Sequence, residues 1–235
     1  TIVYVFAGTQ LAQIDSLQGI LSPGLILAFT LLGIFPLITK KVMSMISARR
    51  VLRKYKAPKS YDYNIAVIGA GSGGLVASYI AAAVKAKVAL IEKHKMGGDC
   101  LNTGCVPSKA LIRTAKMLSY AERAEEFGLK KNEVTFDFKD VMERIQSVIR
   151  KVEPHDSVER YESLGVDCIS GEARIIDPYR IQVGDRTVTA KNIILASGAS
   201  PFVPPIPGID SVNYLTSDTL WDIRELPERL IVLGG

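Results

Sequence analysis

Two cysteines, Cys100 and Cys105, are the residues of this chain whose type and spacing could do redox chemistry. They lie in GGDCLNTGCVPSK, residues 97–109, where glycines and turn formers precede a helix that we expect to begin at Ala110. The N-terminus of a helix favours an anion, so a thiolate there is stabilised. Two thiols this close can also form a disulfide if their Cβ atoms approach to about 4 Å. The segment therefore predicts a dithiol/disulfide switch.

Two other interpretations of the cysteine pair are weaker. Cysteine is often a small core residue, and a zinc site needs about four ligands, commonly in C-x2-C pairs. The remaining candidate ligands, Cys168, His94 and His155, show no metal-ligand spacing. We therefore expect redox chemistry, no metal site, and an inert Cys168. Two of three cysteines in a redox motif also favour a reducing compartment over a secreted disulfide scaffold.

A dinucleotide-binding fingerprint precedes the cysteines. Residues 63–92, YNIAVIGAGSGGLVASYIAAAVKAKVALIE, predict a strand, a G-x-G-x-x-G turn, a small-residue helix and a second strand that ends in Glu92. The first glycine permits a tight turn, the second admits a pyrophosphate, and the third lets helix and strand pack closely. The phosphates would face the helix N-terminus, and the acid can bind a ribose. The turn residues of this site are Gly69, Gly71, Ser72, Gly73 and Gly74. The fingerprint alone does not separate FAD from NAD.

Helices and short strands follow the cysteines. One helix is predicted over 110–127, and a longer one over 137–165, capped by Asp137 and kinked at Pro154. Residues 166–194 contain the short apolar runs VDCIS, EARIID, RIQV, RTVT and NIIL, which predict a β-meander. The fold class expected is α/β, with a Rossmann-like parallel sheet plus the meander.

Together these segments resemble the pyridine nucleotide-disulfide oxidoreductases, a family that includes glutathione reductase, dihydrolipoamide dehydrogenase and mercuric reductase. The resemblance extends from about Tyr63 to the last residue and depends most on GGDCLNTGCVPSKAL. It implies that Cys100 is the interchange thiol that attacks substrate, that Cys105 lies against the flavin, and that Lys109 lies near the flavin's reactive edge. Asp99 replaces the threonine usual in the best-known members, and beside Cys100 it is expected to oppose thiolate formation.

The resemblance also implies FAD as cofactor and NAD(P)H as reductant. The stretch ILASGASP, residues 194–201, is similar to the second FAD-contact motif of the family, with serine in place of the threonine of A-T-G. Hydride would pass from NAD(P)H to FAD, and electrons would pass on to the cysteine pair and then to an acceptor. The motif variant is closest to mercuric-reductase-like members, so Hg(II) is a candidate beside disulfides, and a homodimer is expected. Besides the fingerprint, the implied FAD-binding residues are Lys93, Gly98, Asp99, Ala196, Ser197 and Gly198.

The composition before the fingerprint is different. Residues 20–38, ILSPGLILAFTLLGIFPLI, carry no charge, and at about 1.5 Å per residue they span roughly 28 Å, near the thickness of a bilayer core. The pattern predicts a transmembrane helix, kinked or broken at its prolines and glycines, in the inner membrane, with the flavin domain cytoplasmic. A membrane surface is therefore a better partner than nucleic acid for the acid-free basic cluster that follows, Lys40, Lys41, Arg49, Arg50, Arg53, Lys54, Lys56 and Lys59.

These observations divide the chain into a membrane region (1–48), a basic linker (49–61) and an FAD-binding domain (62–229). The stretch 4–41 is weakly similar to the C-terminal part of DedA-like (VTT domain) membrane proteins, so we expect the chain to start partway through a larger protein. Residues 230–235, LIVLGG, are similar to the start of the NAD(P)H-binding Rossmann domain, cut off at its first turn. The chain alone is therefore expected to be inactive.

Two other functions stay open beside a membrane-tethered disulfide oxidoreductase. A flavin dehydrogenase could reduce quinone at the membrane with the cysteines as bystanders, but the intact C-x4-C motif argues against it. A membrane transport or scaffold protein could carry a vestigial flavin domain. The presence of both cysteines, Lys109 and both FAD motifs in one chain makes that alternative the weakest.

Overall fold

The computed structural model describes residues 5–6, 8–9, 12, 23–130 and 133–234. The chain forms two compact units, Thr1–Ala57 and Pro58–Gly235, and each is described by itself. The division between them falls inside the stretch 49–61, which the sequence predicts as a linker.

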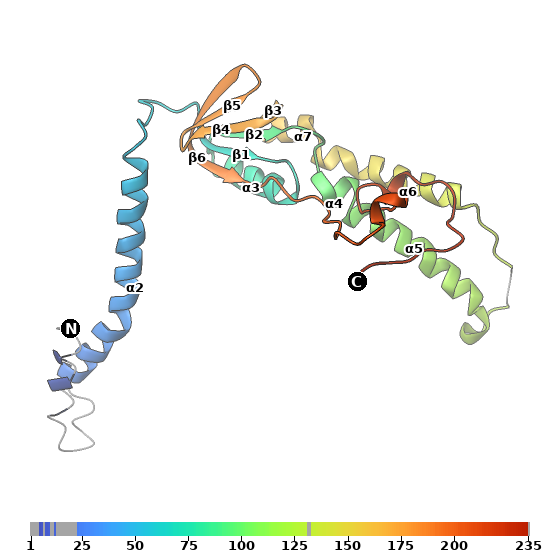
Figure 1. Ribbon diagram of the computed structural model, residues 1–235, viewed down its shortest axis with the longest axis horizontal. Helices are drawn as coiled ribbons and strands as arrows, with labels where there is room; N and C mark the ends of the chain where they lie inside the picture. Colours follow the sequence, from blue (N-terminus) through green and yellow to red (C-terminus); the bar gives the residue numbers. More distant parts are fainter. Residues whose placement is uncertain (1–4, 7, 10–11, 13–22, 131–132, 235) are drawn as a thin grey trace. The chain divides into compact units, whose positions relative to one another are not determined.

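One long helix, α2 (Pro23–Leu52), dominates the N-terminal unit (Figure 1). It continues through Pro36 and runs from the apolar stretch into the basic residues Lys40, Lys41 and Arg50. The helix is therefore not broken at Pro36. Residues 49–52, the first part of the expected linker, form the last turn of α2.

Among the described residues, no helix combines the length and the apolar character needed to cross a bilayer. Of the predicted span 20–38, residues 20–22 lie outside the described residues, and the rest is the first part of α2, which continues directly into charged residues. The transmembrane helix predicted from the sequence is therefore not found.

The second unit is built on a six-stranded mixed sheet in the order β3-β2-β1-β6-β5-β4 (Figure 1). Its parallel half consists of β1 (Tyr63–Ile68), β2 (Val88–Glu92), β3 (Val166–Ser170) and β6 (Arg186–Leu195). The helix α3 (Ser72–Ala83) connects β1 to its parallel neighbour β2, as parallel pairing requires. This is the α/β, Rossmann-like arrangement that the sequence predicts. The carboxyl ends of β1, β2 and β6 meet at one edge.

The β-meander predicted from the sequence is wrong in two places. The strands β4 (Ala173–Asp177) and β5 (Arg180–Val183) extend the sheet from β6 by antiparallel pairing. VDCIS, however, is β3 and pairs in parallel with β2. RTVT and NIIL form the single strand β6, because the Ala190-Lys191 junction between them contains no glycine or proline that would turn the chain. One strand thus serves both halves of the sheet.

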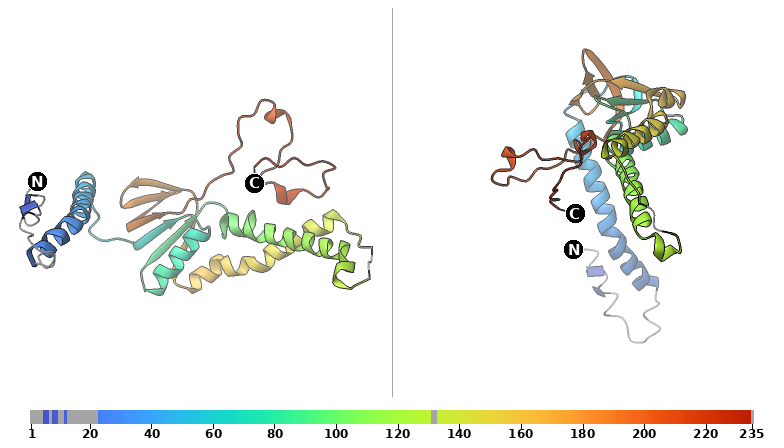
Figure 2. Two further views of the ribbon diagram at one scale, coloured as in Figure 1. Left: turned by 90° about the horizontal axis from the view of Figure 1, so that it is seen from below. Right: turned by 90° about the vertical axis from the view of Figure 1, so that its right-hand side faces the viewer.

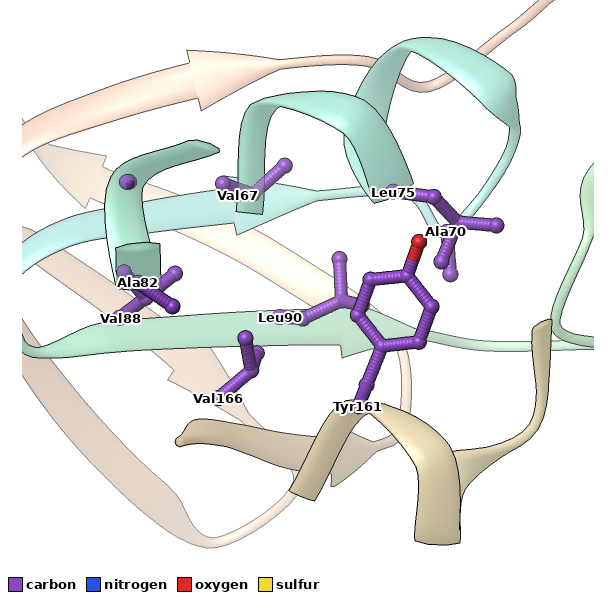
Figure 3. Packing of buried hydrophobic residues seen from close by; sticks show 9 residues of the cluster. Val67, Ala70, Leu75, Ala82, Val88, Leu90, Tyr161 and Val166 are labelled. Carbon is purple, nitrogen blue, oxygen red and sulfur yellow. The ribbon is translucent and has the colours of Figure 1, made fainter. Parts of the chain in front are cut away.

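Alternating side chains of β1 and β2 build apolar layers on both faces of the sheet. On one face Val67 and Leu90 pack against α3 and α7 (Val158–Ser163), with the ring of Tyr161 beside Leu90 (Figure 3). The opposite face packs against side chains from β5 and β6. The buried members of the first layer are Val67, Ala70, Leu75, Ala81, Ala82, Val88, Leu90, Tyr161 and Val166.

A helical layer next to the sheet carries the cysteines. It contains the short helix α4 (Gly98–Asn102) and two longer helices that lie side by side, α5 (Cys105–Glu122) and α6 (Phe138–Val152) (Figures 1 and 2). A short helical turn from the C-terminal region, η5 (Leu220–Asp222), packs on the same layer. The buried residues that join these elements are Leu101, Ala110, Met142, Ile145, Ile149 and Trp221.

The helix predicted over 137–165 has the predicted N-terminal cap but is divided into two helices. Asp137 caps α6 as predicted, because its carboxylate accepts the N–H of Lys139 at 2.8 Å. The helix predicted over 137–165 is interrupted at Pro154, which lies in the 3-10 turn η3 (Glu153–Asp156), and it resumes as α7.

At the C-terminal end of the unit, residues 230–234 do not form the strand that the sequence predicts. They are exposed, and a strand needs a neighbour for its backbone hydrogen bonds.

Candidate redox site

A cavity of about 940 Å³ lies at the carboxyl edge of the parallel strands. Its walls come from the ends of β1 and β2, the start of α3, the helix α4 and the loop after β6. A volume of this size is at the upper end for small-molecule sites. The structure thus brings most of the predicted residues to one place. Those that line the cavity are Gly69, Gly71, Ser72, Gly73, Glu92, Lys93, Gly98, Asp99, Cys100, Ala196, Ser197 and Gly198.

The glycine turn after β1 has the form that a pyrophosphate requires. Gly74 lies behind the wall, and a Cβ at this position would be 1.8 Å from the carbonyl oxygen of Gly69, so α3 packs tightly on the turn. The first turn of α3 has Gly71 as N-cap, contains no acid and opens into the cavity. Backbone N–H groups and the positive end of the helix stabilise an anion at such a position. The residues present therefore fit the diphosphate of FAD.

Glu92 performs a structural task in addition to the one predicted. Its two carboxylate oxygens accept the N–H of Ala70 at 2.6 Å and the N–H of His94 at 2.8 Å. The side chain thereby ties the glycine turn to the end of β2. Each oxygen of a carboxylate has a second lone pair, so hydrogen bonds from a ribose are compatible with both contacts. The neighbouring Lys93 forms an exposed ion pair with Glu172 at 3.5 Å, which contributes little to stability.

The two cysteines lie on consecutive helices, and not on a loop as the sequence suggested. Cys100 is in α4, and Cys105 is the first residue of α5, so only Thr103 and Gly104 separate the helices. The helix begins at Cys105, before the start at Ala110 that we expected from the sequence. Pro107 does not prevent an earlier start, because proline is tolerated in the first turn of a helix.

Cys100 and Cys105 are free thiols. Hydrogen bonding to the Cys105 side chain raises the pKa of Cys100 above its ordinary value, and partial burial and the charge of Cys105 add to the effect, whereas the positive charge of Lys109 lowers it. The sequence suggested Asp99 as the group that opposes ionisation, but its carboxylate is not among these causes. Ionisation of Cys100 therefore depends on Cys105, on partial burial and on Lys109.

The two thiols differ in exposure. Cys100 is half-buried and lines the cavity, whereas Cys105 is exposed and lies outside the cavity lining. The family resemblance implies the opposite order, with Cys105 against the flavin. The roles of the two thiols stay a prediction, and substitution of each cysteine distinguishes the two orders.

The backbone at the start of α4 touches the glycine turn. Gly98 has a φ of +53°, and a Cβ at this position would lie 2.6 Å from the Cα of Gly71. Beside it, the N–H of Gly97 donates to the carbonyl of Ala70 at 2.9 Å. The side-chain amide of Asn102 donates to the carbonyls of Met96 and Gly98, at 3.0 and 2.9 Å, and fixes the same turn. The glycine turn after β1 and the helix α4, which carries Cys100, are therefore in direct contact.

Sequence reasoning missed Trp221, which reaches the thiol helices from far along the chain. Its indole Nε1–H donates to the carbonyl of Thr103 at 2.7 Å, and its side chain is 6% exposed. Its own carbonyl accepts from Gln146 at 3.2 Å and from Arg224 at 3.0 Å. Arg224 in turn pairs with Glu143 at 2.7 Å. The available signal was that Trp221 is the single tryptophan of the chain.

The third cysteine lies apart from this site. Cys168 is on β3, where burial and the nearby acids Glu162, Asp167 and Glu159 raise its pKa to about 11. Among the described residues, no group of three or more histidines, cysteines or acids could hold a metal ion.

Comparison with known proteins gives the following similarities. A family model described as "Pyridine nucleotide-disulphide oxidoreductase" matches residues 63–235. A mercuric reductase of Staphylococcus aureus is 36% identical over 174 residues, which are 74% of this chain and 32% of that protein. A dihydrolipoyl dehydrogenase of Acholeplasma laidlawii is 34% identical over 181 residues, which are 75% of this chain and 54% of that protein.

A solved structure is similar as well. It is the Cu(II) complex of the HOCl-induced flavoprotein disulfide reductase RclA from Escherichia coli, with a TM-score of 0.57 and 27% identity over 69% of this chain and 34% of that chain. This chain thus spans about a third of the mercuric reductase and about half of the dihydrolipoyl dehydrogenase.

Proposed function

This chain belongs to the pyridine nucleotide-disulphide oxidoreductase family, and from that premise we propose that it is the part of a flavoenzyme that holds FAD and a redox-active dithiol, Cys100 and Cys105. The family uses FAD with NAD(P)H. One observation carries the proposal: Cys100 lines the cavity that the predicted FAD-binding residues enclose, and Cys105 begins the next helix.

When bound, FAD would supply the group that relays two electrons from NAD(P)H to the Cys100–Cys105 disulfide. The chain's own residues carry out the sulfur chemistry. Two electrons and two protons break the S–S bond and leave two thiols. The Cys100 thiolate then attacks one sulfur of a substrate disulfide, which forms a mixed disulfide and releases the first thiolate. The Cys105 thiolate attacks the Sγ of Cys100, which releases the second thiolate and restores the internal disulfide. Lys109 favours the attack by lowering the pKa of Cys100.

We propose a disulfide or a thiophilic metal ion, with Hg(II) first, as the acceptor. The support is the name of the mercuric reductases among the similar proteins, and the Cu(II) complex among the similar structures. Two adjacent thiolates are soft ligands of the kind that such ions prefer. Reduction of Hg(II) to Hg(0) takes up the two electrons that a dithiol releases when it returns to the disulfide.

Thiol titration of the full-length, FAD-loaded protein tests the dithiol. Thiols are counted in denaturant before and after addition of NADPH. Two additional thiols should appear in the parent and in the control variant Cys168→Ser, because Cys168 is remote from the site. None should appear in Cys105→Ser. A parent that gains no thiols would refute the proposed function.

The roles of the two thiols need a separate experiment. A thiolate against oxidised flavin gives a long-wavelength charge-transfer band on two-electron reduction. If Cys105 is the flavin-side thiol, Cys100→Ser keeps the band and Cys105→Ser abolishes it. The reverse pattern would assign Cys100 to the flavin, which is the order that the cavity lining favours.

We also propose that residues 20–38 attach the protein to the inner membrane with the flavin-binding unit cytoplasmic, and that the full-length protein is a homodimer. The uncharged run and the basic cluster after it support the first proposal. The family resemblance alone supports the second. Release by alkaline carbonate washing would refute the membrane attachment. Protection of the flavin unit from protease in inside-out vesicles would refute its cytoplasmic orientation. A monomer in sedimentation experiments would refute the dimer.

A further inference from the structure

We propose that Trp221 is a positioning residue for the dithiol: its hydrogen bond to the Thr103 carbonyl fixes the turn between Cys100 and Cys105, and thereby sets how readily the pair forms a disulfide. The inference rests on the proposed function, because only a redox-active pair has a potential to set. It adds a residue from the C-terminal part of the chain to the site.

The turn that Trp221 contacts is short and has few other supports. Thr103 is the C-cap of α4 and Gly104 is the N-cap of α5, and no side chain caps the N-terminus of α5. The N–H of Thr103 bonds to Asp99 at 2.9 Å, and the N–H of Ser108 bonds to Gly104 at 3.0 Å, so both of these bonds stay within the adjoining helices. The bond from Trp221, in contrast, ties the turn to another part of the chain. It acts at the midpoint between the two thiols.

The indole is held firmly enough to fix the turn. Its ring is buried in the cluster that joins α4, α5 and α6. Its carbonyl is held by Gln146 and by Arg224, which is itself anchored by Glu143. The donor therefore cannot swing away without disturbing the cluster.

The same cluster holds the residue next to Cys100. Leu101 is 2% exposed and packs in the cluster with Trp221. The backbone between the thiols is thus restrained at Leu101 by packing and at Thr103 by a hydrogen bond. A disulfide needs its Cβ atoms about 3.5–4.5 Å apart. Restraints that keep the two thiols close raise the effective concentration of one thiol at the other, and so stabilise the disulfide.

The experiment is a thiol–disulfide titration of the FAD-loaded, full-length protein in glutathione buffers. Alkylation and mass spectrometry then report the oxidised fraction of the Cys100–Cys105 peptide, without reference to activity. Trp221→Phe keeps an aromatic ring in the cluster and removes the N–H. Ile149→Val is the control, since it removes a methylene from the same cluster without touching Thr103. Gln146→Leu is a second variant, which removes one of the two hydrogen bonds to the carbonyl of Trp221 and leaves the one from Arg224.

Loss of one hydrogen bond should lower the equilibrium constant for disulfide formation about fivefold to tenfold in Trp221→Phe. For a two-electron couple this makes the potential about 20–30 mV less negative. The hydrogen bond between the thiols should weaken as well, so Cys100 should react with iodoacetamide at lower pH. Gln146→Leu should shift in the same direction by less, and Ile149→Val should not shift.

An unchanged constant in Trp221→Phe, or an equal shift in Ile149→Val, would overturn the inference while the proposed function stands. A parent whose pair shows no reversible oxidation would refute the proposed function and the inference with it. The titration of the parent therefore separates the two failures.

Discussion

Replacement of Gly98 by alanine tests whether the close contact between α4 and the glycine turn after β1 is needed for the shape of the cavity. A Cβ at Gly98 would lie 2.6 Å from the Cα of Gly71 and 3.3 Å from its nitrogen. Gly71 has no side chain that could move aside, so the backbone of α4 or of the glycine turn must shift. Either shift moves a wall of the cavity.

A matched control is available at Gly128. Its φ is +73°, also in the left-handed region, but a Cβ there would meet nothing within 4 Å. Left-handed strain costs about 1–2 kcal/mol for a residue with a Cβ. Overpacking against atoms that cannot yield costs a further 1–3 kcal/mol, roughly. We therefore expect the free energy of unfolding to fall by about 1–2 kcal/mol in Gly128→Ala. In Gly98→Ala it should fall by about 2–5 kcal/mol.

Urea denaturation, followed by the fluorescence of Trp221, measures the free energy of unfolding of each variant. The dissociation constant of FAD, measured by flavin fluorescence, should rise in Gly98→Ala and stay unchanged in Gly128→Ala. Equal losses of stability in the two variants would refute the argument from close contact. An unchanged FAD affinity in Gly98→Ala would show that the turn keeps its shape while α4 alone moves.

Three further predictions follow from single side chains. Lys109→Met removes a charge that lowers the pKa of Cys100, so the pH profile of iodoacetamide reaction at Cys100 should move to higher pH, and a move to lower pH would contradict this. Burial raises the pKa of Cys168 to about 11. At pH 8 only about a thousandth of the Cys168 side chains are thiolate. In the native protein, iodoacetamide should therefore leave Cys168 unmodified while it reacts with the exposed Cys105. Equal labelling of the two cysteines would contradict the buried environment of Cys168. The hydroxyl of Ser78 is buried with no hydrogen-bond partner among the described residues, so Ser78→Ala should keep the unfolding free energy or raise it by about 1 kcal/mol. A loss in thermal or urea denaturation would show that this hydroxyl has a partner.

The parts of the site that could be predicted from the sequence are those fixed over short separations. The glycine turn, the helix after it and Glu92 lie within one strand–helix–strand unit, where Gly69 and Gly74 leave no room for a Cβ. The arrival of residues 196–198 at the same cavity was implied by the resemblance. Its physical cause is that β6 lies parallel to β1, which brings both strand ends to one edge.

The parts that could not be predicted depend on choices between distant partners. VDCIS has the pattern of a strand in either orientation, so its parallel pairing with β2 could not be distinguished from a place in the meander. The start of α5 at Cys105 depends on packing against α6 as well as on local propensity. Trp221 is in a polar stretch, and its contact with Thr103 joins positions 118 residues apart. No local pattern marks such a contact.

The separation between Thr103 and Trp221 also determines the order in which the site can be completed during synthesis. The ribosome adds about 5–20 residues per second, so the 118 residues between them take about 6–24 s. Throughout that interval both cysteines have been made, but the indole that holds their turn has not. The nascent thiols can then react with glutathione or with cysteines of other chains. Correct maturation of the pair is therefore a competition between elongation and oxidation.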